Sequence, residues 1–197
     1  MYTPGNGHLV YAEDGTARLN IAGASYGPGG SGARVTYTIA PSEFGFILIA
    51  ATSHGICWLG IHKGAAYLES ELRGDFPKAE IVRNDDAMRD VASRIIAFVD
   101  GTGASLDLSL DIRATPFQLT VWRELCAIPS GMTRSYGEIA RRLGQPGAAR
   151  AVGHANSSNP LAVLIPCHRA VGADGKLTGY RWGLEYKCRL LEQERTL

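Results

Sequence analysis

Residues 161–169 read LAVLIPCHR, an apolar run that ends in a thiol, an imidazole and a guanidinium. The apolar part predicts a buried segment, and burial alone would raise the pKa of the Cys167 thiol. The neighbouring His168 would act in the opposite direction, and the thiolate is the nucleophilic form of cysteine. For an arbitrary Cys-His pair, a buried structural cysteine is the commoner outcome. The stretch alone therefore leaves two alternatives at Cys167, a nucleophile and a core residue.

The other three cysteines fit core positions better than reactive ones. Cys57 falls in a strand pattern, Cys126 in a helix pattern and Cys188 in the predicted last helix. There is no Cys-x-x-Cys pair, no set of Cys, His, Asp or Glu with the spacing of metal ligands, and no glycine-rich phosphate loop after a strand. We therefore expect no metal, no cofactor, and reduced cysteines in a cytoplasmic protein.

Short helices are predicted upstream of this stretch. Thr-Pro at residues 115–116 predicts the start of one helix, because proline fits the first helical turn. SYGE at residues 135–138 is a capping box that predicts a second helix, and a third covers residues 148–155 after a tight turn. The last two form a helix-turn-helix candidate. Small residues surround Arg150 in the third helix, a pattern typical of tight helix packing or of close approach to a DNA groove.

The N-terminal part of the chain predicts a small α/β domain with an antiparallel hairpin. The strand patterns cover residues 35–39, 46–51, 56–61 and 106–110, and the helical patterns cover residues 65–72 and 88–99. Residues 1–33 contain eight glycines and show no sustained period, so we expect a linker or tail there. The expected domains then span residues 34–112 and 113–197.

Charge is distributed unevenly along the chain. Residues 113–197 contain 12 Lys and Arg against 6 Asp and Glu, whereas residues 1–112 contain 8 against 13. A basic C-terminal half favours a polyanion as its partner, although an uneven solvated surface explains the charge equally well. The longest apolar runs, at residues 46–51 and 161–165, are far too short to cross a bilayer, so we expect no membrane contact.

Taken together, the motifs resemble those of the O6-alkylguanine-DNA alkyltransferases. The resemblance covers about residues 35–194, and its matched motifs are AARAVG at 148–153, NP at 159–160, LIPCHR at 164–169, GYRWG at 179–183, Lys187 and LL at 190–191. The YRWG form is similar to the C-terminal half of bacterial adaptive-response (Ada-type) proteins. The resemblance implies a ribonuclease-H-like α/β N-terminal domain and a mainly helical C-terminal domain that contains the helix-turn-helix.

The activity implied by the resemblance is direct-reversal DNA repair. Such a protein binds double-stranded DNA through the minor groove and flips the damaged nucleotide out of the helix. It then transfers a methyl or other alkyl group from O6 of guanine, or from O4 of thymine, irreversibly to a cysteine. The protein is consumed in one reaction, and we expect it to act as a monomer.

Roles carry over from the resemblance position by position. Cys167 is similar to the alkyl acceptor, His168 to the base that forms the thiolate through a water, and Glu194 to the carboxylate that orients this histidine. Tyr136 is similar to the phenol that gives a proton to the leaving guanine. Arg150 is similar to the finger that fills the space left by the extruded base.

The remaining matched positions are expected to contact DNA or to support the pocket. The DNA-contacting positions are Ser135, Ala149 and Ala151. The pocket and its supporting loops comprise Asn159, Pro166, Ala170, Tyr180, Arg181, Trp182 and Lys187. Among these, Asn159 is similar to the residue that ties the helix-turn-helix to the active-site loop, and Ala170 replaces a larger aliphatic residue of many relatives.

Three other hypotheses compete with this one. A non-catalytic sensor of the alkyltransferase-like type binds the same lesions but lacks the acceptor cysteine, whereas Cys167 is present. A plain helix-turn-helix regulator leaves residues 161–169 unexplained, and a thiol hydrolase would need an oxyanion site that no motif specifies. The segment before residue 34 lacks the cysteine-rich and regulatory modules of Ada-type proteins, so we do not expect transcriptional control by this chain.

Overall fold

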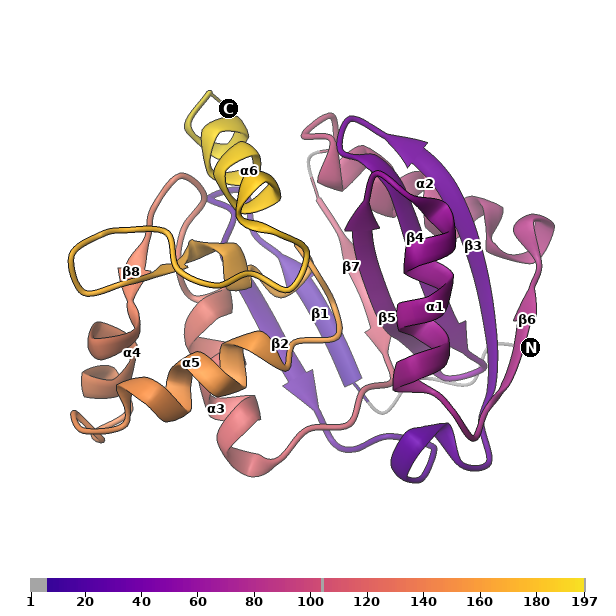
Figure 1. Ribbon diagram of the computed structural model, residues 1–197, viewed down its shortest axis with the longest axis horizontal. Coiled ribbons are helices and arrows are strands. Elements are labelled where there is room, and N and C mark those ends of the chain that lie inside the picture. Colours follow the sequence, from indigo (N-terminus) through magenta and orange to yellow (C-terminus); the bar gives the residue numbers. More distant parts are fainter. Residues whose placement is uncertain (1–6, 104, 197) are drawn as a thin grey trace. The chain divides into compact units, whose positions relative to one another are not determined.

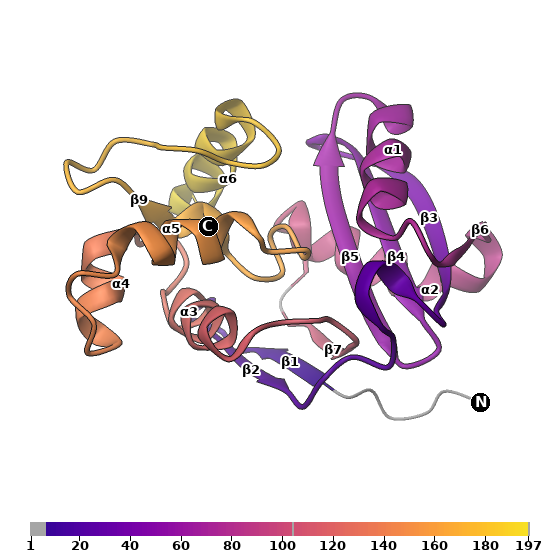
Figure 2. The same cartoon turned by 60° about the horizontal axis from the view of Figure 1, so that its bottom comes forward.

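The structure is a computed structural model that describes residues 7–103 and 105–196. The described residues form a mixed α/β fold with six α-helices and a large sheet (Figures 1 and 2). They divide into two compact units. The first comprises the described residues up to Val10 together with Asn20–Arg113, and the second comprises Tyr11–Leu19 and Ala114–Leu197. None of the described helices is long and apolar enough to span a membrane.

The strands of the first unit belong to a seven-stranded sheet with the order β2-β1-β7-β5-β4-β3-β6 (Figure 1). Its strands are β1 (Gly7–Tyr11), β2 (Ala17–Ile21), β3 (Arg34–Ser42), β4 (Gly45–Thr52), β5 (Gly55–His62), β6 (Glu80–Arg83) and β7 (Asp107–Leu110). The pairs β1/β7, β3/β4 and β4/β5 are antiparallel, and the pairs β3/β6 and β5/β7 are parallel. The sheet is therefore mixed, with the β4–β5 hairpin near its centre.

The predicted hairpin and helices of this unit are confirmed. Helices α1 (Ala65–Asp75) and α2 (Asp85–Val99) lie on opposite faces of the sheet (Figures 1 and 2). Both faces of β4 and β5 are buried as a result, which explains why these strands are continuous apolar runs in the sequence. Asn84 caps the start of α2, and its side-chain oxygen accepts a hydrogen bond from the Ala87 backbone N–H at 3.0 Å.

The structure corrects the prediction of a linker or tail over most of residues 1–33. Residues 7–33 contain β1, β2 and the short 3-10 helix η1 (Pro28–Gly30). The loop between β2 and η1 is fixed by Asp111, a fully buried carboxylate that accepts hydrogen bonds from the Ser25 backbone N–H at 2.7 Å and from the hydroxyls of Ser25 and Thr52. Residues 1–6 of the predicted tail lie outside the described residues, and the domain boundaries 34–112 and 113–197 stay predictions.

The second unit is mainly helical. Its elements are α3 (Pro116–Cys126), β8 (Arg134–Ser135), α4 (Tyr136–Arg142), α5 (Ala149–Ser157), the 3-10 helix η2 (Cys167–Arg169), β9 (Ala170–Val171) and α6 (Leu184–Thr196). Ser135 caps α4 with a reciprocal capping box, as the sequence predicts, and Thr115 caps α3 in the same way at the predicted Thr-Pro start. Strands β8 and β9 form a short parallel pair that joins Arg134 to Ala170, directly after η2.

Candidate active site

The segment that leads to Cys167 crosses the core of the second unit under backbone strain. Every residue from Leu161 to Val171 is buried. Val163 has a φ of 65°, a conformation that a β-branched side chain strongly disfavours. The Tyr11 hydroxyl donates to the carbonyl oxygen of Leu164 at 2.9 Å and to that of Val163 at 3.3 Å. These contacts hold the turn that sets the direction of the chain before Cys167.

Asn159 joins the end of helix α5 to this segment. Its side-chain oxygen accepts a hydrogen bond from the Leu161 N–H at 2.9 Å. Its amide nitrogen donates toward the carbonyl oxygens of Leu161 at 3.1 Å and Ile165 at 2.8 Å, and toward the Cys167 sulfur at 3.1 Å. One buried side chain therefore fixes the loop and also places a hydrogen-bond donor on the thiol.

Cys167 begins η2, directly after Pro166, and it is 5% exposed. Burial raises the pKa of its thiol, while the hydrogen bond from Asn159 and the positive charge of Lys187 oppose that rise. His168 is fully buried, and burial lowers its pKa against the opposing effect of Glu194. At neutral pH the resting pair is therefore a thiol beside a neutral imidazole.

Glu194 defines which nitrogen of His168 is free. Its Oε1 lies 2.7 Å from His168 Nε2, so the proton of the neutral ring belongs on Nε2 and Nδ1 is an acceptor. Nδ1 is buried and has no hydrogen-bond partner among the described residues. Although burial opposes ionisation, hydrogen bonds from His168 and Arg169 lower the pKa of Glu194 to about 2. An ionised carboxylate thus orients an imidazole whose second nitrogen is available as a base.

Arg169 holds Glu194 in this position, and the sequence reasoning assigned it no role. Its Nε and Nη2 donate to the Glu194 carboxylate at 2.9–3.1 Å, and its Nη1 donates to the Gly15 carbonyl at 2.7 Å. The Gly131 N–H also donates to Glu194, at 3.1 Å. Gly131 has a φ of 73°, and a Cβ there would lie 3.1 Å from the Glu194 carbonyl oxygen. The signal for Arg169 was its place beside His168 in the quoted motif.

Three further predicted site residues lie close enough to Cys167 to interact with it electrostatically. Lys187 is fully buried and donates from Nζ to the Thr178 carbonyl at 2.9 Å. The charge of Cys167 acts on Lys187, Tyr180 and Tyr136. Burial, followed by the nearby Cys167, raises the pKa of the Tyr180 phenol. The predicted catalytic group therefore comes together from α4, η2, α6 and the loop before α6.

Other predicted positions lie elsewhere in the same unit. Ala170 is fully buried and pairs with Arg134 in the β8–β9 ladder. Trp182 is buried, and the Arg181 guanidinium lies 5.0 Å from the centre of its ring. The position of Trp182 fits either a pocket wall or a packing residue.

The predicted DNA-contacting residues cluster on α4 and α5, which lie side by side (Figures 1 and 2). Ser135 caps α4, and Ala149 lies in the first turn of α5. Arg150 and Ala151 are exposed, whereas Val152 on the same helix is buried. Helix α5 thus turns one face to the core and presents a cation with small residues on the other.

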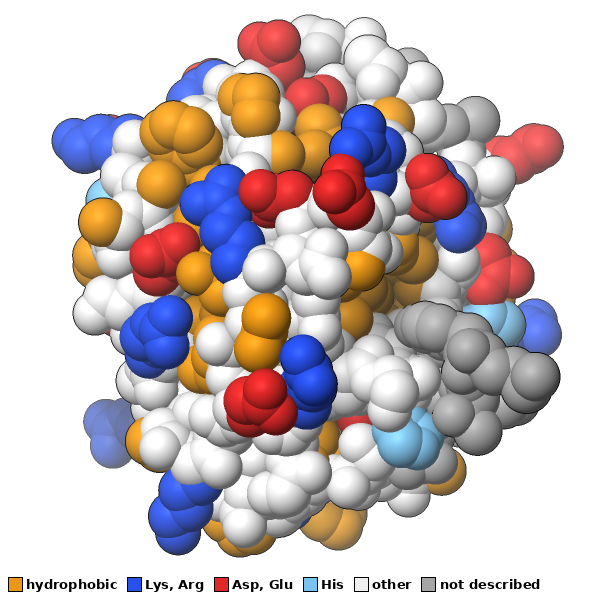
Figure 3. Space-filling view, turned by 90° about the vertical axis from the view of Figure 1, so that its right-hand side faces the viewer, with side chains coloured by type: hydrophobic (Ala, Val, Ile, Leu, Met, Phe, Trp, Pro, Cys, Tyr) orange, Lys and Arg blue, Asp and Glu red, His pale blue; other side chains and the backbone are white. Residues whose placement is uncertain are grey.

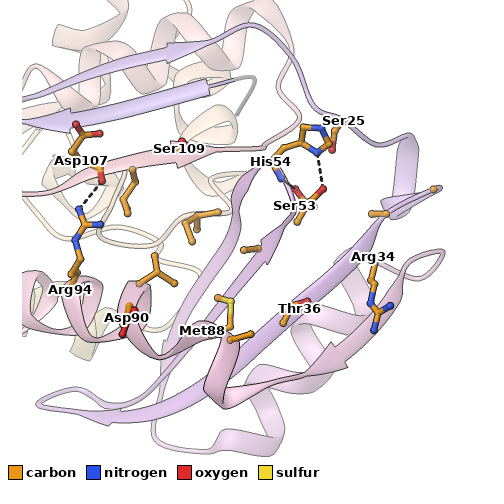
Figure 4. Close-up of a pocket in the computed structure, with 18 residues that line it drawn as sticks. Ser25, Arg34, Thr36, Ser53, His54, Met88, Asp90, Arg94, Asp107 and Ser109 are labelled. Atoms are coloured by element: carbon orange, nitrogen blue, oxygen red, sulfur yellow. Dashed lines mark hydrogen bonds between the residues drawn. The ribbon is translucent and has the colours of Figure 1, made fainter. Parts of the chain in front are cut away.

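One cavity of the first unit contains none of the predicted site residues. It has a volume of about 820 Å³ and lies between α2 and strands of the sheet (Figure 4). Arg94 from α2 donates to the Asp107 carbonyl at 2.9 Å, and His54 contacts the Ser53 hydroxyl at its other end. The view onto this unit in Figure 3 shows acidic and basic side chains interspersed. Among the described residues, no group of three or more His, Cys, Asp or Glu could hold a metal ion.

Comparison with known proteins identifies the family. Residues 116–196 match the family described as 6-O-methylguanine DNA methyltransferase, DNA binding domain. The chain is 42% identical over 158 residues to the methylated-DNA–protein-cysteine methyltransferase of Methanosarcina mazei, covering 80% of this chain and 96% of that protein. This chain belongs to the methylated-DNA–protein-cysteine methyltransferase family.

The family likeness extends to the Ada-type proteins and to solved structures. The bifunctional transcriptional activator/DNA repair enzyme Ada of Escherichia coli is 40% identical over 176 residues, which are 89% of this chain but 50% of that relative. The chain thus spans half the length of that relative. A crystal structure of Mycobacterium tuberculosis O6-methylguanine methyltransferase is 39% identical, with a TM-score of 0.67, and covers 82% of this chain and 93% of that one. A structure of the M. tuberculosis protein in complex with DNA has a TM-score of 0.65, is 38% identical and covers 83% of this chain and 93% of that one.

Proposed function

We propose that this chain repairs double-stranded DNA by moving an alkyl group from O6 of guanine to the Cys167 sulfur. The observation that supports this most is the buried arrangement of Cys167, Asn159, His168 and Glu194 in a chain of this family. The non-catalytic sensor hypothesis is not favoured, because the acceptor cysteine is present within a complete hydrogen-bonded set.

The chemistry begins with removal of the thiol proton. A water between the Cys167 sulfur and His168 Nδ1 passes this proton to the imidazole, and the Glu194 carboxylate stabilises the imidazolium that forms. The Asn159 N–H and the Lys187 ammonium stabilise the thiolate. Cys167 and His168 thus become charged together, as a thiolate and an imidazolium. A buried site tolerates such a pair of opposite charges better than one isolated charge.

The alkyl transfer is a displacement at carbon. The thiolate sulfur attacks the alkyl carbon, the bond from carbon to O6 breaks, and its electron pair stays with the purine. Tyr136 gives the guanine a proton, and the Arg181 backbone N–H donates to O6 as negative charge develops there. The thioether on Cys167 has no simple route back, so each protein molecule reacts once. The same attack at O4 of thymine is a further expected reaction.

Access to the base requires that the nucleotide leave the helix. We propose that α4 and α5 act as the helix-turn-helix, that α5 enters the minor groove, and that Arg150 fills the space of the flipped base. The exposed Arg150 and the small Ala149 and Ala151 beside it support this arrangement. Ser135, at the start of α4, contacts the DNA backbone in this proposal. The ribonuclease-H-like class of the first unit, the monomeric state and the cytoplasmic location stay predictions.

The test is to incubate the protein with duplex DNA that contains O6-methylguanine and to measure the guanine that is restored. We expect the native protein to restore at most one guanine per molecule. Cys167→Ser should bind the same duplex and restore none. Restoration by Cys167→Ser, or repeated turnover by the native protein, would overturn the proposal.

A further inference from the structure

One residue of the segment that leads to Cys167 has a backbone conformation that its own side chain disfavours. Val163 has a φ of 65°, and it is the only residue other than glycine with a positive φ among the described residues. Valine is β-branched, and in this left-handed conformation its Cβ lies too close to a backbone carbonyl oxygen. Such a conformation persists only where the surrounding structure holds it. The turn at Val163 is therefore maintained by contacts from other parts of the second unit.

Tyr11 supplies the contacts that hold this turn. Its hydroxyl donates to the carbonyl oxygens of Leu164, at 2.9 Å, and of Val163, at 3.3 Å. Asn159 binds carbonyl oxygens on either side of this pair. Tyr11 is itself buried, so water cannot easily replace its hydrogen bonds. Burial also raises the pKa of its phenol well above the usual value, so the hydroxyl remains a donor.

Tyr11 is anchored by the turn that follows it in the chain and that belongs, like Tyr11, to the second unit. At this turn Gly15 has a φ of 72°, and a Cβ there would lie 2.5 Å from the Cβ of Ser130, so the close packing requires glycine. The Gly15 carbonyl oxygen accepts a hydrogen bond from Arg169 Nη1 at 2.7 Å. The same short segment therefore contacts the chain both before and after Cys167.

The turn at Val163 determines where the thiol lies. Cys167 follows four positions later, and its N–H donates to the Ile165 carbonyl oxygen at 2.7 Å, which makes the connection tight. A change of φ at Val163 would redirect this connection and move the Cys167 sulfur away from the Asn159 amide nitrogen, which lies 3.1 Å from it. A displacement of about 1 Å can slow a reaction by about a hundredfold.

We propose that Tyr11 is a positioning residue for the reaction, whose hydroxyl holds Val163 in its left-handed conformation and thereby fixes the position of the Cys167 sulfur. This inference rests on the proposed function. Tyr11 neither contacts the substrate nor exchanges a proton, and it acts only through the backbone that leads to Cys167. The bonds that form and break are those of the alkyl transfer.

The experiment removes the hydroxyl and then the strain that it opposes. Tyr11→Phe keeps the ring and should lower the rate of methyl transfer at saturating duplex DNA about tenfold, while the DNA concentration that gives half the maximal rate stays unchanged. Adding Val163→Gly should restore most of the lost rate, because glycine adopts a positive φ without strain. Adding Val163→Ala should restore none, because alanine also removes the valine methyl groups but keeps the Cβ.

The same variants separate this role from a merely structural one. In the Val163→Gly background, Tyr11→Phe should cost at most about twofold, and this comparison carries the test even if Tyr11→Phe alone does not fold. Binding of the methylated duplex, measured with each change in a Cys167→Ser background, should stay at the native level.

Three results would overturn the inference: a native rate in Tyr11→Phe, equal rates in the glycine and alanine double variants, or a tenfold loss in the Val163→Gly background. Failure of the native protein to modify Cys167 would instead refute the proposed function.

Discussion

At the scale of single residues, Cys167 and His168 are both neutral at rest, and in the proposed mechanism they become charged only as the protein reacts. The pKa of Cys167 is raised and that of His168 is lowered, both chiefly by burial. Among Cys167, His168 and Glu194, Glu194 alone is already ionised at rest, and Arg169 binds its carboxylate. The arrangement keeps a reactive thiolate from persisting in the absence of a substrate, while the base that can create it stays in place.

This charge state predicts the pH dependence of methyl transfer. The rate should be constant through neutral and weakly alkaline pH, and it should fall in acid as His168 takes a proton. Because the pKa of His168 is lowered, that fall should lie below the usual histidine range. Glu194→Gln should reduce the rate about a hundredfold, since the imidazolium loses its carboxylate. A rate that keeps rising with pH until the thiol ionises would show that His168 is not the base.

A second prediction at this scale concerns Trp182. If the loop before α6 walls the pocket, the indole removes volume that a bulky alkyl group needs, and a steric clash of that kind discriminates strongly. We expect the native protein to react poorly with free O6-benzylguanine and Trp182→Gly to react faster, with little change for O6-methylguanine DNA. Trp182→Phe is the matched control for loss of the cation–π contact with Arg181. Ready reaction of the native protein with benzylguanine would refute the narrow pocket.

At the scale of elements, helix α5 connects the proposed DNA-binding surface to the thiol. Its buried face leads through Asn159 to Cys167, and its exposed face presents Arg150. Arg150→Ala should slow repair of duplex DNA at least tenfold and leave reaction with the free modified base nearly unchanged, because extrusion is the step it serves. Arg141→Ala, an exposed cation on α4, is the matched control for lost charge. Equal losses on both substrates would assign Arg150 a structural role.

The elements that sequence reasoning predicted are those with a local signal. The Thr-Pro start of α3, the capping box at Ser135 and the buried β4–β5 hairpin were each visible in a few consecutive residues. Strands β1, β2 and β6 were missed because they are only four or five residues long, and β1 and β2 lie in a glycine-rich segment. Their pairing depends on partners distant in sequence, such as Leu9 opposite Leu108.

In the candidate site, too, contacts between residues distant in the sequence could not be predicted. The resemblance supplied Cys167, His168 and Glu194, but a glutamate 26 positions from its histidine has no local signal of its own. The hydrogen bonds around Glu194 also could not be predicted. Arg169 is 154 positions from Gly15, whose carbonyl it binds, and 25 positions from Glu194, whose carboxylate it binds. Such contacts exist only once the second unit has folded.

At the scale of the whole molecule, the Arg169–Glu194 network links the site to acid stability. Glu194 has a pKa of about 2 in the folded protein, below its usual range. Its ionised carboxylate therefore adds to the free energy of unfolding above about pH 4.5, and this contribution is lost as the pH falls toward 2. We expect that contribution to reach about 3 kcal/mol. Urea unfolding at about pH 7 and about pH 3 should show this loss in the native protein and a smaller one in Glu194→Gln. Equal losses in both would place the acid sensitivity elsewhere.

The central claim is that Cys167 alone accepts the alkyl group, and one measurement tests it most directly. The native protein is incubated with excess duplex DNA containing O6-methylguanine, and its intact mass and peptide masses are then determined. We predict that every modified molecule gains one methyl group in place of one hydrogen, located on the peptide that contains Cys167. A methyl group on Cys57, Cys126 or Cys188, or a protein whose mass does not change while guanine is restored, would contradict the account.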